Sequence, residues 1–280
     1  MTASVRKSAA SPTRYAEAFI AAEAFGALDD VLWRPVSRGA VSSAGPKPGE
    51  HVLDACCGNG ASALPSARLV GRSGSMHGVD LSPALTATAR SRAASEGLDW
   101  ASFTANDATK FPIPAGSFDL VQCVLGIFFF PDVEAGTRSL IRQTRPGGRT
   151  ALTIWRRGAI SPIGECLMEA LSPFKPHLGE ESRNQVGTLL NRINTAPTYA
   201  DWLQDLGLEQ VRIDVPEHRI ELDERTAWAL VLGSAFRAML AGLVPAQITE
   251  VRHRYLDILE QRKTTHIDAS TLVGIGKVPQ

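Results

Sequence analysis

The sequence predicts an α/β fold built around a mostly parallel sheet with an antiparallel last strand. Short apolar segments of the kind that form buried strands alternate with helical segments between residues 49 and 155, and the connections are short. This alternation is typical of parallel sheets that helices cover on both faces. A glycine-rich turn follows the first of these strands, and an aspartate ends the second. Both lie at the edge where open α/β sheets bind ligands.

Seven strands are expected from the apolar runs and from the turn residues between them. The predicted strands are 51–56, 75–80, 100–104, 118–124, 150–155, 210–215 and 270–275. Ser82 and Pro83 provide an N-cap and a first helical position directly after the second strand. At 280 residues the chain is long enough for one large domain with an embellishment.

The segments on either side of this core are expected to be helical. Residues 1–48 form an N-terminal cap, in which Tyr15 to Leu32 shows helical spacing and a Gly/Pro/Ser-rich stretch from Ser37 to Gly49 is predicted to be a linker. Residues 49–155 form the ligand-binding core. Residues 198–280 complete the sheet and carry two inserted amphipathic helices.

Composition excludes several classes of partner. The chain has 29 basic and 29 acidic residues and no net charge, so nothing in it favours phosphate backbones or anionic membranes. Its four cysteines form no C-x-x-C pair and no metal site is predicted. The first residues lack the apolar run of a signal peptide. We therefore expect a cytoplasmic protein, and we leave self-association open.

The most informative motif begins at the end of the first predicted strand. Asp54 is followed by Gly58 and Gly60, and Asp80 lies 20 residues after Gly60. This pattern also fits the dinucleotide-binding fingerprint, so a nicotinamide-dependent oxidoreductase is a serious alternative. A dinucleotide places an anionic pyrophosphate at the following helix N-terminus, where the carboxylate of Asp54 would repel it. A ligand that brings positive charge to this place fits better.

At this point the chain resembles the class I S-adenosylmethionine-dependent methyltransferases, which have a Rossmann-like fold. The first motif is Val52 to Gly60, the second is Gly78 to Ser82, and Asn106-Asp107-Ala108 resembles the turn that contacts adenine. Arg145 to Arg149 is similar to the turn before the fifth strand. The nearest similarity is to the branch of ubiquinone and menaquinone biosynthesis, which holds many small-molecule tailoring enzymes. Cys56-Cys57 departs from the family, which more often has Gly-Cys there.

The resemblance implies S-adenosylmethionine as the cofactor and assigns a role to each of ten residues. Asp54 would accept from the methionyl amine, and Gly58 and Gly60 let the backbone approach the ligand. Asp80 would accept both ribose hydroxyls. The remaining expected contacts are Cys56 in the first loop, Leu81 beside Asp80, Asp107 and Ala108 at the adenine, Cys123 near the methionyl group and Tyr15 over its carboxylate. For Asp107 a helix N-cap is an equally good interpretation.

Residues 156–197 are expected to form a lid. They leave the sheet at its carboxyl end, and Ile160, Ile163, Leu167, Met168 and Leu171 recur at helical spacing. Their apolar face can pack on the core, on another subunit or over a bound acceptor, and we favour the acceptor because methyl transfer profits from excluding water.

The predicted function is methyl transfer to a small, largely apolar acceptor. Gly126 to Pro131 follows the fourth strand, and one or two of its three phenylalanines are expected to line the acceptor pocket. No catalytic base is named, because the sulfonium is already activated and holding a nucleophile in line supplies most of the acceleration. The alternatives are the oxidoreductase and a non-catalytic cofactor-binding protein.

Overall fold

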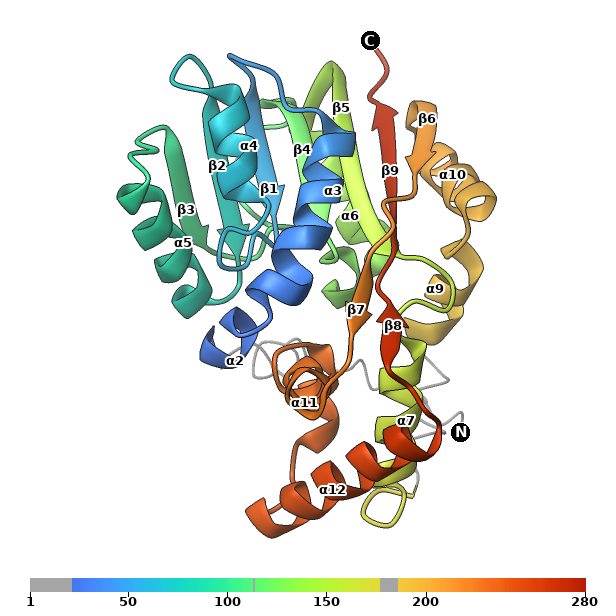
Figure 1. Ribbon diagram of the computed structural model, residues 1–280. Coiled ribbons are helices and arrows are strands. Elements are labelled where there is room, and N and C mark those ends of the chain that lie inside the picture. Colours follow the sequence, from blue (N-terminus) through green and yellow to red (C-terminus); the bar gives the residue numbers. More distant parts are fainter. Residues whose placement is uncertain (1–21, 113, 177–185) are drawn as a thin grey trace, which may run out of the picture.

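The core of the molecule is a seven-stranded sheet with the order β3-β2-β1-β4-β5-β9-β6 (Figure 1). The computed structural model describes residues 22–112, 114–176 and 186–280. The strands are β1 (His51–Ala55), β2 (Ser75–Asp80), β3 (Ala101–Ala105), β4 (Phe118–Val124), β5 (Thr144–Trp155), β6 (Glu209–Asp214) and β9 (Thr271–Lys277). Only β9 runs antiparallel to its two neighbours, β5 and β6. The predicted mostly parallel sheet with an antiparallel last strand is confirmed.

Helices cover both faces of the sheet, and the alternation of side chains along the strands explains why. Val52 of β1 packs with α3 (Arg34–Ala44), α4 (Ala63–Val70) and α5 (Pro83–Ser95) on one face. Leu53 packs with α6 (Val133–Gln143) and α10 (Ala196–Asp205) on the other. Both side chains are fully buried. Strands buried on both sides are continuously apolar, which is why the sequence reveals them.

The N-terminal cap differs from its prediction. Its described part consists of α2 (Ala22–Gly26), a π-helical turn η1 (Asp29–Trp33) and α3. The linker predicted from Ser37 is therefore wrong, because α3 runs through most of it and ends at the left-handed Gly45. Three buried side chains at helical spacing, Val36, Ala40 and Ala44, pack in the hydrophobic clusters between α3 and the sheet. Packing outweighs the weak helix propensity of serine and glycine here.

A helical lobe, which we define as residues 161–171 and 224–261, lies beyond the carboxyl edge of the sheet (Figure 1). It contains α7 (Ser161–Leu171), α11 (Glu224–Leu232), the 3₁₀-helix η3 (Ala235–Leu240) and α12 (Pro245–Gln261). A two-stranded ribbon of β7 (Arg219–Glu221) and β8 (His266–Asp268) joins it to β6 and β9. Another helix, α9 (Val186–Ile193), precedes α10. No helix among the described residues is long and apolar enough to cross a bilayer.

The structure corrects the lid prediction. The apolar face of α7 is covered within the chain itself, since Ile163 and Leu167 are fully buried and α7 packs against α12. Arg262 at the end of α12 also pairs with Glu165 and Glu169 of α7. The face that we expected over a bound acceptor therefore belongs to the core of the helical lobe. The helices inserted between β6 and β9 supply the cover, a contact that the sequence of α7 does not reveal.

Candidate active site at the carboxyl edge of the sheet

The loops that follow β1, β2 and β4 meet at one edge of the sheet, because these strands are parallel neighbours. The β1 loop is a tight turn in which Gly58 and Gly60 both have left-handed φ angles, 54° and 91°. A Cβ at Gly58 would lie 3.2 Å from the Phe25 ring of α2. Glycine is therefore required at position 58 by the backbone angle and by the close approach of the cap.

Asp80 ends β2 and ties the two predicted cofactor motifs together. Its Oδ2 accepts a hydrogen bond from the Gly58 N–H at 2.9 Å, and its Oδ1 accepts one from the Ser82 N–H at 2.9 Å. Burial raises the pKa of Asp80, although these two hydrogen bonds oppose the rise. A carboxylate oxygen can accept more than one donor. Asp80 is thus half-buried, anchored by backbone and able to accept from two neighbouring hydroxyls.

Asp54 lies beneath the glycine loop and is fully buried. Its Oδ2 accepts from Ser62 Oγ at 2.6 Å, where Ser62 is the N-cap of α4. Its Oδ1 has no hydrogen-bond partner among the described residues, and neither does Nε2 of Gln122, its register partner on β4. Burial raises the pKa of Asp54 to about 7, against the lowering effects of Ser62 and of the nearby polar side chain of Gln122. A positive charge near this strand end would stabilise the ionised form of Asp54.

Two thiols lie side by side at the floor of the same edge. Cys56 has a left-handed φ of 59°, a backbone angle that residues with a Cβ seldom adopt and glycine adopts easily. A Cβ at Gly126 would lie 2.5 Å from Cβ of Cys56 and 2.7 Å from Sγ of Cys123, so Gly126 leaves room for both. The neighbouring Cys123 thiol and burial together raise the pKa of Cys56. The Cys56 thiol is therefore favoured in its neutral form, and it lies beside Cys123 at the end of β4.

The expected adenine contacts are placed at the same edge, after β2 and β3. Leu81, which directly follows Asp80, is 54% exposed. Asp107 forms a local turn in which its Oδ1 accepts from the Thr109 N–H at 2.9 Å, but none of the described residues between β3 and β4 is helical, so the helix N-cap interpretation is wrong. Burial by itself would raise the pKa of Asp107. The hydrogen bonds from Thr109 and the ion pair with Lys110 outweigh burial, so the pKa is lowered. Ala108 is buried, and its carbonyl accepts from Gln143.

Several predicted residues fall elsewhere. Tyr15 lies outside the described residues, so its contact stays a prediction. Phe130 packs against Gly136 of α6 and belongs to the core, whereas Phe128 and Phe129 form an edge-to-face pair on η2 (Ile127–Phe129). A separate polar groove of about 610 Å³ follows the β7–β8 ribbon; its lining includes Arg156, His218, Arg219, His266 and Asp268. None of the predicted cofactor residues lines that groove.

Side chains of the N-terminal cap contact the glycine loop, and these contacts are not among the predictions from the sequence. Asn59, between the two glycines, is 2% exposed and donates from Nδ2 to Asp29 Oδ1 at 2.8 Å. Phe25 stacks on Trp33 with ring centroids 4.6 Å apart and lies over Gly58. These cap residues lie 25 or more positions before Gly58, so only the helical pattern of the cap signals their presence.

Known proteins resemble this chain over the same region. A family model described as a methyltransferase domain matches residues 52–148. Nocamycin O-methyltransferase of Saccharothrix syringae is 36% identical over 122 residues, which are 44% of this chain and 44% of that protein. Aklanonic acid methyltransferase DauC of Streptomyces sp. (strain C5) is 34% identical over 171 residues, 59% of this chain and 75% of that protein. The chain therefore spans less than half the length of the first relative and three quarters of the second.

A solved structure shows that the likeness extends to the fold. The YcgJ protein of Bacillus subtilis superposes with a TM-score of 0.56 at 16% identity, covering 88% of this chain and 98% of that one. At this identity the match establishes the fold alone. The sequence match to DauC, above 30% over three quarters of its length, establishes the family and displaces the oxidoreductase alternative. The chain belongs to the S-adenosylmethionine-dependent methyltransferases, as its motifs predict.

Proposed function

We propose that this chain transfers a methyl group from S-adenosylmethionine to a small, largely apolar acceptor. The observation that carries the proposal is the Asp80 carboxylate, which is hydrogen-bonded to the Gly58 N–H of the glycine loop and remains half-buried at the carboxyl edge of the sheet. A fixed carboxylate beside two glycines, which leave room for a ligand, suits a ribose with two adjacent hydroxyls.

The residues of this edge fit the other parts of the cofactor as well. The unpartnered Oδ1 of buried Asp54 is compatible with the positive charge of a methionyl amine, acting directly or through water. Exposed Leu81 offers an apolar surface to one face of the adenine. We assign Cys56 and Cys123 to the walls of the methionyl end, where their small side chains exclude water.

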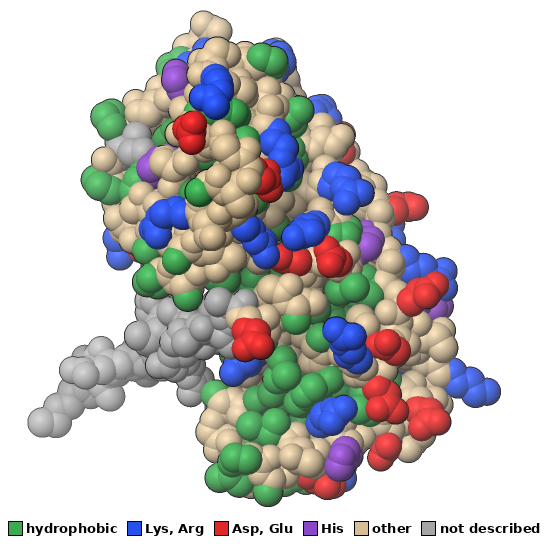
Figure 2. Space-filling model, turned by 60° about the vertical axis from the view of Figure 1, so that its left-hand side comes forward, with side chains coloured by type: hydrophobic (Ala, Val, Ile, Leu, Met, Phe, Trp, Pro, Cys, Tyr) green, Lys and Arg blue, Asp and Glu red, His purple; other side chains and the backbone are tan. Residues whose placement is uncertain are grey.

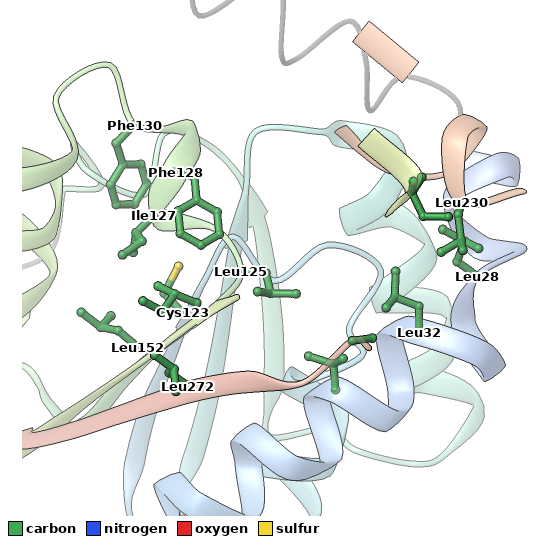
Figure 3. Packing of buried hydrophobic residues seen from close by; sticks show 14 of the residues in the cluster. Leu28, Leu32, Cys123, Leu125, Ile127, Phe128, Phe130, Leu152, Leu230 and Leu272 are labelled. Atoms are coloured by element: carbon green, nitrogen blue, oxygen red, sulfur yellow. The ribbon is translucent and has the colours of Figure 1, made fainter. Parts of the chain in front are cut away.

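The part of the core next to the place from which the methyl group would leave is apolar. Figure 3 shows the buried side chains of Leu125 and Phe128 after β4, with buried Leu28 and Leu32 of the cap and Leu230 of α11 across from them. In Figure 2 hydrophobic side chains gather on the lower part of the molecule, over the helical lobe. Half-buried apolar residues of the lobe include Trp228, Leu232, Phe236, Met239 and Leu243. These surfaces support an apolar acceptor, held between the lobe and the strand ends.

The acceptors named for the two relatives point in the same direction. One relative is named for the methylation of nocamycin and the other for that of aklanonic acid. We infer a biosynthetic small molecule as the acceptor of this chain too. We also propose that the chain works in the cytoplasm without nucleic acid or membrane partners, in keeping with its zero net charge and its four free thiols.

The chemistry needs little from the protein beyond placement. When bound, S-adenosylmethionine supplies a methyl group already activated by its sulfonium. The chain's own task is to fix the cofactor through Asp80 and the glycine loop, to keep water away with the apolar lobe, and to hold the acceptor in line. Of the histidines, His218 and His266 line the separate groove, and neither is assigned a role in proton transfer.

The test is acceptor-dependent turnover. The purified chain is incubated with S-adenosylmethionine and either nocamycin-type or aklanonic-type acids, and mass spectrometry is used to detect a product heavier by one methyl group together with S-adenosylhomocysteine. The matched control is Asp30→Asn, a change at an exposed cap residue whose side chain pairs with Arg34 on the surface. A chain that binds S-adenosylhomocysteine tightly yet methylates no acceptor would favour the non-catalytic alternative.

A further inference from the structure

A buried acid of the N-terminal cap is bonded to the cofactor loop. Asp29, the first residue of η1, is only 5% exposed. Its Oδ1 accepts from Asn59 Nδ2 at 2.8 Å, and its Oδ2 accepts from Nη2 of Arg92 on α5. Arg34 approaches the same oxygen at 3.9 Å from the solvent side. The carboxylate thus connects the cap, the glycine loop and α5 at a single point.

Asn59 is held on two sides. Its side chain donates to Asp29, and its carbonyl accepts from Arg92 Nη1 at 3.3 Å. Because Arg92 also binds Asp29, the three residues form a closed ring of interactions. Fixing both the side chain and the carbonyl of Asn59 fixes the peptide plane that leads into Gly60. The orientation of the loop backbone is therefore set from outside the loop.

The loop passes this orientation on to the proposed ribose acid. Gly58, directly before Asn59, donates its N–H to Asp80 Oδ2. A displacement of Asn59 would move the Gly58 N–H, and the hydrogen bond that anchors Asp80 would lengthen. A chain of direct contacts therefore runs from Asp29 through Asn59 and Gly58 to Asp80. Glycines have no side chains to resist such a shift, so the loop depends on its outer contacts.

Because Asp29 is buried, losing its contacts should cost more free energy than losing those of an exposed acid. A carboxylate at 5% exposure is tolerated because Arg92 and Asn59 satisfy it. Replacing the carboxylate by an amide leaves one of the two donors without an acceptor and removes the charge from the bond that remains, and hydrogen bonds to charged groups are among the stronger ones in proteins. The neighbouring Asp30 is different, because its side chain is 86% exposed and it pairs with Arg34 on the surface. Although Asp29 and Asp30 are adjacent, removing the charge of Asp29 should therefore cost much more free energy than removing that of Asp30.

We propose that Asp29 is a positioning residue of the cofactor site. It holds Asn59, and through it the segment from Cys57 to Gly60, in the conformation that receives the cofactor. The inference rests on the proposed function, because it takes this loop to be the cofactor loop. It also means that docking of the cap and binding of the cofactor are coupled, so each stabilises the other.

The test is calorimetric binding of S-adenosylhomocysteine by the full chain and by its Asp29→Asn variant. Loss of the charged contact is expected to weaken binding by roughly 10- to 100-fold. Asp30→Asn is the matched control and should bind like the unaltered chain. Thermal unfolding of each variant is recorded in parallel, because a purely structural tether would lower the melting temperature while leaving the affinity of the folded protein unchanged.

A double-mutant cycle distinguishes coupling from general damage. Asn59→Ala leaves in place the pair of Asp29 and Arg92 and the bond from Arg92 to the carbonyl of residue 59, but it removes the direct bond from the loop to Asp29, so it should weaken binding by itself. In the double variant the Asp29→Asn change should then add little, because both changes break one chain of contacts. Asn59→Ala also decides the matter if Asp29→Asn does not fold: unchanged affinity in this variant overturns the proposal.

The outcomes separate this inference from the proposed function. If the unaltered chain fails to bind S-adenosylhomocysteine, the proposed function is wrong and the inference falls with it. If the unaltered chain binds and folded Asp29→Asn binds equally well, only the inference is overturned, and Asp29 is a tether of the cap. Weakened binding by Asp29→Asn, with Asp30→Asn unaffected, supports the positioning role.

Discussion

The titration of Asp54 should make cofactor binding depend on pH. Burial raises the pKa of this carboxyl to about 7 in the folded chain, so it is protonated below that pH. A bound ligand that brings an ammonium and a sulfonium to the strand end favours the ionised form and lowers this pKa again. S-adenosylhomocysteine retains the ammonium, so its binding should release a proton below pH 7. Its affinity should therefore rise with pH and level off above about pH 7.5.

The magnitude follows from the size of the shift. If the ligand returns Asp54 to an ordinary carboxyl pKa near 3.9, the dissociation constant should fall roughly 20- to 30-fold between pH 5.5 and 7.5. The same shift affects stability with a definite sign. Because the folded pKa is raised, Asp54 contributes stability that is complete below about pH 4 and lost as the pH rises through about 7, at most about 4 kcal/mol.

Calorimetry at several pH values, in two buffers with different ionisation heats, measures both the affinity and the proton released. Asp54→Asn keeps the shape of the side chain and removes its titration, so its affinity profile should be much flatter. Any remaining slope belongs to groups such as Asp80, whose pKa burial also raises. An unaltered chain with constant affinity from pH 5.5 to 7.5, or a variant with the same slope as the unaltered chain, would refute the reasoning.

Three further changes test separate parts of the structure. Asp80→Ala should weaken binding of S-adenosylhomocysteine roughly 30- to 1,000-fold by calorimetry, because two charge-assisted hydrogen bonds are lost. Gly58→Ala should lower both affinity and melting temperature, since the left-handed backbone costs a residue with a Cβ about 1–2 kcal/mol and the new Cβ presses on Phe25. Ile163→Ala in α7 should lower the free energy of unfolding in urea by about 2–5 kcal/mol and leave cofactor affinity of the folded chain unchanged.

The core and the cofactor motifs could be predicted because their signals are local. Each central strand is a short apolar run, and Gly58, Gly60 and Asp80 stand at strand ends where the chain must turn. The start of α10 shows the usual error at a boundary: the sequence suggests a cap at Thr198, whereas the helix begins at Ala196 with Thr195 as its N-cap. Neighbouring threonines offer nearly equivalent caps, so the pattern does not choose between them.

The cap and the lobe were harder to predict because contacts between distant segments decide them. Gly39 suggests a linker, yet in α3 it lies where a Cβ would come within 2.7 Å of Pro216, so it permits close packing rather than ending the helix. The apolar face of α7 looks free in sequence, and only the fold brings α12 against it. The bond between Asp29 and Asn59 likewise joins positions that no short-range pattern connects.

The most direct test of the central claim is the choice of ligand. Calorimetry of the unaltered chain with S-adenosylhomocysteine and, separately, with NADH distinguishes the methyltransferase site from a dinucleotide site built on the same glycine loop. The account predicts binding of S-adenosylhomocysteine in the micromolar range and no binding of NADH, because the carboxylate of Asp54 at the strand end opposes a pyrophosphate. Tight binding of NADH together with no binding of S-adenosylhomocysteine would contradict it.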